Sequence, residues 1–251
     1  MKDLISVSVT AKKFDIEKIK TDILALGFYE EADKPSGIAA EVDKKLDNSI
    51  KKLLSLGDFK GKKGSTSVIY TNEKFGADRV LLVGLGKKED FKVGDLRKAA
   101  TKAASMAVEK EAKTVTLALH DEVEDLEKAG QCIAEGGYFG SYRYDEFVSD
   151  EDKKKSKKVK IELTDTENKV LTKLRRGIKV GKIIGEAQSF GRTIANRPGN
   201  IINPPELAKA ARKMAKETTG LTCTVFTEKQ LEQKKMGGIL AIGSGSKSAP
   251  R

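Results

Sequence analysis

Residues 194–207, with the sequence IANRPGNIINPPEL, constrain the fold more than any other part of the chain. Three of the five prolines lie here, at Pro198, Pro204 and Pro205. Because proline fixes φ and has no backbone N–H to donate, neither a helix nor a central strand can run through the segment. We therefore predict a rigid loop between two helices, with Asn203 as the N-cap of the second helix and the prolines after it in the first turn.

Residues 1–160 alternate between the apolar patterns of strands and those of helices. We predict strands at residues 4–9, 23–29, 67–71, 79–86, 114–119 and 159–164, the last as a late or edge strand. We predict helices at residues 41–56, 93–111 and about 123–140. This alternation is typical of an α/β domain, in which helices cover both faces of a mixed, mostly parallel sheet.

The pattern changes after residue 160. We predict a long helix at residues 166–195, within a connecting segment placed at 161–195. Beyond the proline-rich loop we predict a helix at 205–218, a strand at 221–226, a short helix at 228–234 and a strand at 238–242. This order is that of a second α/β domain, residues 196–251, which is incomplete because it is too short to close a core by itself.

The composition fits a globular protein in water. Hydrophobic residues make up 38% of the chain and charged residues 34%, which argues against extensive disorder. No apolar run approaches the roughly 18 residues that span a bilayer, and the N-terminus lacks the apolar core of a secretory signal. We therefore expect a cytoplasmic protein whose two cysteines, Cys132 and Cys223, are buried and reduced.

The formal net charge of +11 raises the question of a nucleic-acid surface. Residues 1–160 contain 31 Lys and Arg against 29 Asp and Glu, whereas residues 161–251 contain 17 against 8. The excess is therefore confined to the last third of the chain. Binding of DNA or RNA stays an alternative that is not favoured.

Two glycine-rich turns resemble phosphate-binding motifs but lack required residues. In GLGKKE, residues 84–89, the third glycine of a dinucleotide-binding turn is replaced by Glu89, so we interpret the glycines as a tightly packed strand end. In GSGSKS, residues 243–248, a P-loop requires glycine where Ser246 and Ala241 stand. We therefore predict no cofactor-binding residues and no nucleotide hydrolysis.

Three further features leave a structural and a functional interpretation. His120, the single histidine, is interpreted as a strand-terminal surface or core residue, because one histidine and two distant cysteines cannot assemble a zinc site. Lysines at residues 153–158 indicate a solvated loop, with phosphate contacts as the alternative. Residues 136–147 predict a helix that packs through its glycines and ends in aromatic residues at the domain junction. The alternative there is base stacking on Tyr138, Tyr142 and Tyr144 around Arg143.

Four segments resemble, in the same order, the leucyl aminopeptidases of the M17 family. They are DRVLLVGLGK (78–87), AEGGYFGSYRYDEF (134–147), FGRTIANRPGNIINPPELA (190–208) and MGGILAIGSGSKSAPR (236–251). The third resembles the segment that opens the catalytic domain of that family. The resemblance covers most of the chain and implies a macro-domain-like N-terminal domain followed by the beginning of the catalytic domain.

The resemblance also implies an activity for the parent protein. Members of the family release N-terminal amino acids from peptides, use two divalent cations (Mn or Zn) and are active as hexamers. Their metal-binding and catalytic residues follow the segment that residues 236–251 resemble. We therefore predict that this chain contains no catalytic and no metal-binding residues and has no peptidase activity alone. The alternatives are a macro-like module that binds a ligand or nucleic acid, and a structural domain for oligomerisation.

Overall fold

The computed structural model describes residues 6–120, 123–149, 151 and 158–251. The chain divides into two compact units, Met1–Ser189 and Phe190–Arg251. The first part of the strand predicted at residues 4–9 and most of the lysine-rich segment 153–158 lie outside the described residues.

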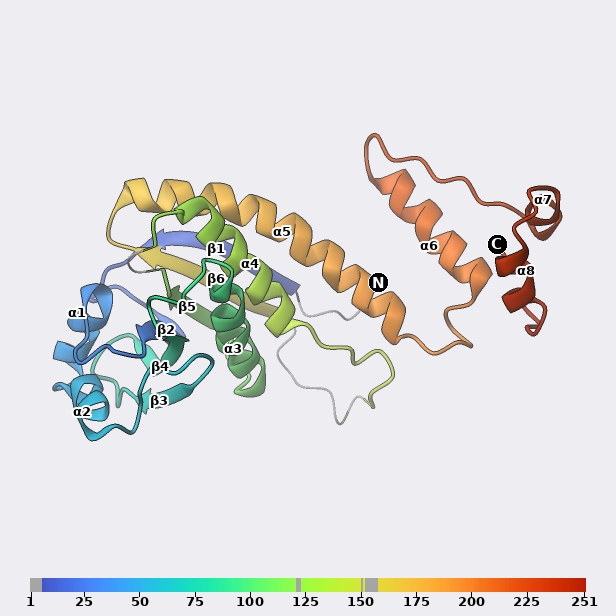
Figure 1. The fold of residues 1–251 in the computed structure, drawn as a ribbon. Helices are drawn as coiled ribbons and strands as arrows, with labels where there is room; N and C mark the ends of the chain where they lie inside the picture. The colour runs from blue at the N-terminus through green and yellow to red at the C-terminus, as the bar shows by residue number, and fades with distance from the viewer. Residues whose placement is uncertain (1–5, 121–122, 150, 152–157) are drawn as a thin grey trace. The chain divides into compact units, whose positions relative to one another are not determined.

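A six-stranded sheet forms the centre of the first unit (Figure 1). Its strands are β1 (Ser6–Lys13), β2 (Thr21–Tyr29), β3 (Thr66–Tyr70), β4 (Ala77–Gly86), β5 (Thr114–Ala118) and β6 (Lys158–Asp165). They lie in the order β1-β6-β5-β2-β4-β3, and every pair is parallel except β3 with β4. The mixed, mostly parallel sheet is therefore confirmed.

The strand predicted at residues 159–164 as a late or edge strand is β6, the last strand in the sequence, and it takes an internal position in the sheet. It pairs with β5 on one side and with β1 on the other, in a register that runs from Ser6 opposite Lys158 to Lys13 opposite Asp165. The alternating, half-exposed strand β1 takes the edge position instead. The lysines of β6, Lys158 and Lys160, lie near its start and are exposed.

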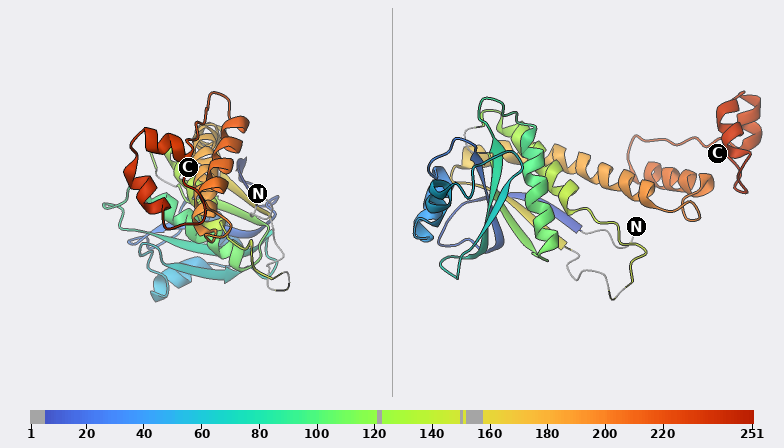
Figure 2. Two further views of the ribbon diagram at one scale, coloured as in Figure 1. Left: turned by 90° about the vertical axis from the view of Figure 1, so that its right-hand side faces the viewer. Right: turned by 60° about the horizontal axis from the view of Figure 1, so that its bottom comes forward.

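Helices cover both faces of the sheet (Figure 2). The helices are α1 (Gly37–Lys45), α2 (Ser49–Leu56), α3 (Asp95–Glu109), α4 (Leu126–Ser141) and α5 (Asn168–Asn196). Alternate residues of β2 point to opposite faces: Ile23 and Ala25 pack with α3, α4 and α5, whereas Leu24 and Leu26 pack with α1 and α2. The apolar run of β2 is continuous because both of its faces are buried.

The single helix predicted at residues 41–56 is wrong, because the chain forms α1 and α2 with a sharp turn between them. Asp47 and Asn48 have φ values of 52° and 60°, in the left-handed region that interrupts a helix. The buried Asp43 carboxylate accepts a hydrogen bond of 2.8 Å from the backbone N–H of Ile50 in the first turn of α2. The helical spacing of apolar residues continues across this turn, so the pattern did not reveal it.

Helix α4 packs closely against α3 and α5 through glycines. A Cβ atom placed on Gly136 would lie 2.9 Å from Cβ of Ala100 in α3 and overlap the carbonyl oxygen of Arg97. Gly177 of α5 is equally close to α4, since a Cβ there would lie 2.7 Å from the backbone nitrogen of Gln131. The predicted packing of residues 136–147 through glycines is confirmed for the helical part of that segment.

The second unit begins within the C-terminal end of α5 and contains α6 (Pro204–Glu217), α7 (Glu228–Gln233) and α8 (Gly237–Gly243). As predicted, the proline-rich segment is a loop, Asn203 accepts a hydrogen bond of 3.2 Å from the N–H of Glu206, and prolines occupy the first turn of α6. The strands predicted at 221–226 and 238–242 are wrong. Residues 190–251 are all described and none forms a strand, so no neighbour pairs with these apolar runs, and the second forms α8.

Candidate functional site

A cleft of about 280 Å³ lies at the carboxyl ends of the central strands of the sheet. It is lined by the ends of β2, β4 and β5, through Tyr29, Leu85 and Leu119, and by the loop from β2 to α1. The order of strands switches sides here. β4 lies on one side of β2, and α3 then carries the chain across to β5 on the other side of β2. Open α/β sheets bind ligands at this position, which makes the cleft the candidate functional site.

The cleft offers an aromatic surface and charges of both signs. The ring of Tyr29 meets that of Phe91 edge-on, with 5.3 Å between the centroids, and Nζ of Lys88 lies 6.0 Å from the Tyr29 centroid. Glu31 and Lys34 lie on the opposite loop. No histidine or cysteine lines the cleft in the described part of the chain. The arrangement therefore suits binding of a planar or charged group.

The turn at residues 84–89 borders this cleft. A Cβ on Gly84 would lie 2.5 Å from the hydroxyl of Ser65 and overlap the carbonyl oxygen of Lys62, and Gly86 has a φ of 85°. Both positions require glycine, which confirms a tightly packed strand end. Leu85 and Lys88 of the same turn line the cleft, which the sequence did not reveal. The cleft forms only where the ends of β2, β4 and β5 meet, and these ends are far apart along the chain.

His120 links the ends of two strands. Its side chain is buried at the end of β5, and its Nε2 lies 3.0 Å from Oδ2 of Asp165 at the end of β6. Burial acts to raise the pKa of Asp165, but the hydrogen bonds from His120 and from the backbone N–H of Glu167 outweigh it, so that this pKa is lowered. His120 is thus a core residue that joins two strands, as one of its two structural interpretations predicted.

Replacing Asp165 with asparagine is expected to lower the free energy of unfolding by about 1–2 kcal/mol at pH 7. Because the pKa of Asp165 is depressed in the folded state, the carboxylate contributes stability above its unfolded pKa of about 3.9, and that contribution is lost as the pH falls through the folded value. The difference between wild type and D165N should therefore shrink below pH 4. Urea unfolding from pH 3 to 7 measures it, with the exposed Asp58→Asn as the control; a constant difference would contradict the role of ionised Asp165.

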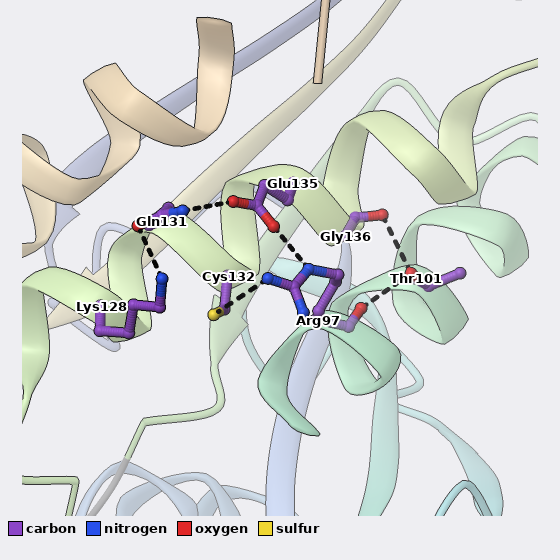
Figure 3. A network of polar contacts seen from close by, with 7 residues as sticks. All are labelled: Arg97, Thr101, Lys128, Gln131, Cys132, Glu135 and Gly136. Atoms are coloured by element: carbon purple, nitrogen blue, oxygen red, sulfur yellow. Dashed lines mark hydrogen bonds and ion pairs between the residues drawn. The ribbon is translucent and has the colours of Figure 1, made fainter. Parts of the chain in front are cut away.

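The most extensive described buried polar network joins α3 to α4 (Figure 3). Nε of Arg97 lies 2.5 Å from Oε2 of Glu135, which is 5% exposed, and Nη2 of Arg97 lies 3.6 Å from Sγ of Cys132. Nε2 of Gln131 donates to the other Glu135 oxygen at 2.6 Å. Burial raises the pKa of the Cys132 thiol, so this cysteine stays protonated at neutral pH. The cluster joins two helices, and none of its residues lines either of the two cavities described for the first unit.

The tyrosines predicted as possible base-stacking residues and Cys223 do not form a common site in the described structure. Tyr138 is buried, so its ring is not available for stacking on a base. Burial together with the nearby Glu186 raises the pKa of its hydroxyl to about 12. Tyr142 and Tyr144 follow the end of α4. Cys223 is a free thiol like Cys132 but is only half-buried, so the prediction that both are buried is wrong for Cys223.

Backbone N–H groups of the loop at residues 243–248 donate hydrogen bonds within the loop itself. The N–H of Ser246 donates to the carbonyl of Gly243 at 3.0 Å, and that of Ser248 donates to the Ser246 hydroxyl at 3.1 Å. These N–H groups are therefore not directed together at an anion. Among the residues that the structure describes, no group of three or more His, Cys, Asp or Glu is close enough to hold a metal ion, so these residues do not fit a dinuclear centre.

Comparison with known families gives two matches along the chain. The N-terminal domain of the cytosol aminopeptidase family matches residues 25–151, and the catalytic domain of the same family matches residues 189–251. The chain belongs to the cytosol aminopeptidase family. Its relatives include the probable cytosol aminopeptidases of Aquifex aeolicus, 37% identical over 98% of this chain, and of a Sulfurihydrogenibium species, 31% identical over 98%.

This member of the cytosol aminopeptidase family spans about half the length of those relatives, 47% and 48% respectively. A mutant of tomato leucine aminopeptidase shares its fold, with a TM-score of 0.83 and 24% identity over 100% of this chain and 50% of that one. The bottromycin maturation enzyme BotP in complex with Mn matches with a TM-score of 0.68 and 25% identity, over 91% and 43% of the two chains.

The matches agree with the position of the proline-rich loop. The match to the catalytic domain of cytosol aminopeptidases begins at residue 189, where the chain also divides into its two compact units, and the loop at residues 194–207 follows directly. In the described part of the chain, no helix is long and apolar enough to cross a membrane.

Proposed function

We propose that this chain is the N-terminal part of a metal-dependent leucyl aminopeptidase that releases N-terminal amino acids from peptides. The observation that carries the proposal is the match of two domains of one family in the correct order along one chain. The identity of 37% to a relative over nearly the whole chain supports it.

We propose three regions within that enzyme: a macro-like α/β domain predicted at residues 1–160, a connecting helix predicted at 161–195, and the beginning of the catalytic domain at 196–251. The first boundary falls inside β6 (Lys158–Asp165), so the sheet of the first domain continues to Asp165, and the connecting helix α5 begins at Asn168. The separate compactness of Phe190–Arg251 and the catalytic-domain match from residue 189 support this division. The macro-like domain is supported by helices on both faces of a mostly parallel sheet.

The metal centre belongs, in this proposal, to the part of the relatives that the chain does not span. Two divalent cations, Mn or Zn, would polarise the scissile carbonyl and activate a water molecule. The lack of a metal-binding group among the described residues and the Mn complex of BotP support this assignment. We further propose that the parent enzyme is cytoplasmic and assembles as a homo-hexamer that acts on peptide substrates.

Peptidase activity is expected only when the catalytic half is supplied. The 251-residue chain, purified with Mn²⁺ or Zn²⁺, should release no product from leucine p-nitroanilide. A chimera of this chain with the remaining half of the Aquifex aeolicus relative should hydrolyse the substrate in a metal-dependent manner, and the intact relative serves as the positive control. Metal-stimulated hydrolysis by the chain alone would refute the assignment of the active site to the other half.

The two alternatives to an enzyme fragment are a ligand-binding module and an assembly domain. The cleft at the strand ends, with Tyr29 and Lys88, supports binding of a small ligand by the first unit. Exposed apolar residues on α5, Val180, Ile183 and Ile184, support a role in association between chains. Both roles are compatible with the aminopeptidase proposal, because each concerns a surface outside the catalytic centre.

A further inference from the structure

A second cavity, of about 360 Å³, lies under the connection between β1 and β2. These two strands are parallel to their neighbours and are separated in the sheet by β6 and β5. Residues 14–20 must therefore carry the chain across the face of β6 and β5, from the carboxyl end of β1 to the amino end of β2. No helix forms in this connection, and the cavity remains between it and the sheet.

The connection is held firmly at both ends. The backbone N–H of Phe14 donates to the carbonyl of Asp165 at 2.8 Å, and the Phe14 ring is buried in the core beneath α1 and α2. At the other end, the N–H of Thr21 donates to the carbonyl of Gly76 at 2.9 Å. Residues 14–20 are therefore anchored to the sheet at both ends of the connection.

The floor of the cavity contains buried polar side chains. Thr116 is 4% exposed, and its hydroxyl makes no hydrogen bond within the described residues, although it lines the cavity. Glu162 is 7% exposed and lines the cavity beside it, and one of its carboxylate oxygens is 2.8 Å from Nζ of Lys160. The Thr116 hydroxyl is therefore open to the cavity, where it can both donate a hydrogen bond to a bound group and accept one.

The entrance of the cavity is positively charged. Lys12, Lys13 and Lys20 line it, and none of them forms an ion pair with a residue that the structure describes. Lys18 also lines it but pairs with Asp15 at 3.1 Å. Three lysines with no carboxylate partner among the described residues favour an anionic group at the entrance.

We propose that this cavity binds a small phosphate ester that carries hydroxyl groups, of the sugar-phosphate class. The phosphate lies at the entrance among Lys12, Lys13 and Lys20, and the hydroxyl groups reach Thr116 and the carboxylate of Glu162 on the floor. The volume is within the range of about 300–1,000 Å³ that small-molecule sites occupy. This site is separate from the cleft at the ends of β2 and β4 and does not depend on peptidase activity.

Isothermal titration of the 251-residue chain with ribose 5-phosphate, inorganic phosphate and ribose tests the proposal. Ribose 5-phosphate should bind in a saturable manner, more tightly than either component alone, and less tightly as salt rises. Thr116→Val removes one hydrogen bond at constant shape and should weaken binding about two- to tenfold. A double variant, Lys12→Gln with Lys20→Gln, should weaken it by about tenfold or more.

Matched controls keep the result interpretable. Lys98→Gln with Lys102→Gln removes the same two charges from exposed positions of α3, away from the cavity, and should leave the affinity for ribose 5-phosphate unchanged. Because the Thr116 hydroxyl has no protein partner, T116V should melt at the temperature of the wild type, which shows that its fold is intact. Absence of saturable binding overturns the proposal. So does an affinity that T116V and the lysine variants leave unaltered, or inorganic phosphate binding as tightly as ribose 5-phosphate.

Discussion

Replacing Gly177 with alanine is expected to lower the free energy of unfolding of the first unit by about 2 kcal/mol or more. A methyl group at this position would overlap the carbonyl oxygen of Glu127 and lie 2.7 Å from the backbone nitrogen of Gln131, both in α4. Backbone atoms cannot rotate away as a side chain does, so α5 has to move from α4 and separate the buried Leu174 and Ile178 from the core. Urea unfolding followed by circular dichroism measures the loss.

A glycine of the same helix provides the control for Gly177. Gly191 has nothing within 4 Å of the position of an added Cβ. Gly191→Ala should therefore stabilise α5 by roughly 0.5–1 kcal/mol, because alanine loses less backbone entropy than glycine in a helix. If both alanine variants were stabilising, α4 and α5 would not be in the close contact that the structure shows.

The spacing of these α5 glycines could be read from the sequence, whereas other features could not. Gly177, Gly181 and Gly185 recur at intervals of four, which places them on one helix face, and a Cβ on Gly181 or Gly185 would also be too close to α4. The sequence prediction followed the apolar residues of the helix and overlooked this face. Small residues at a spacing of four are a usable signal for close helix packing.

The buried strands were predictable because their side chains carry the information. β2 and β4 are apolar on both faces, so the pattern is continuous, and the helices that cover them follow directly in the chain. The break between α1 and α2 depends on backbone conformations at Asp47 and Asn48 and on the Asp43 carboxylate. The apolar spacing does not contain these features.

Strand assignments after residue 220 failed for a different physical reason. The hydrogen bonds of a strand come from another segment, so an apolar run such as residues 238–242 cannot specify a strand by itself. A helix forms its hydrogen bonds within the segment, and α8 results where none of residues 190–251 supplies a pairing strand.

The cavity at Thr116 could not be predicted from the sequence either, because it depends on the path of residues 14–20 over β5 and β6.

Replacing Arg97 with alanine is expected to cost about 2 kcal/mol of unfolding free energy. Glu135 is buried, and after removal of Arg97 its carboxylate would keep, among the side chains of Figure 3, only the hydrogen bond from Gln131. Breaking a fully buried ion pair costs about 3–5 kcal/mol. The expected loss is smaller here because the Arg97 side chain is 43% exposed, so that water reaches the position it leaves. Arg97→Lys should cost less than R97A, because the charge stays while the guanidinium contacts are lost.

The comparison that isolates the ion pair is a double variant. In Arg97→Met with Glu135→Gln, no charge is left buried without a partner, so the double variant should be more stable than R97A. Lys182→Ala removes an exposed pair with Glu186 in α5, at 3.9 Å, and should change stability by no more than about 0.5 kcal/mol. Because Glu135 is shielded from solvent, the cost of R97A should also persist at high salt. A cost that vanished in 1 M salt would mean that the Arg97–Glu135 pair is screened by solvent and does not hold α3 to α4.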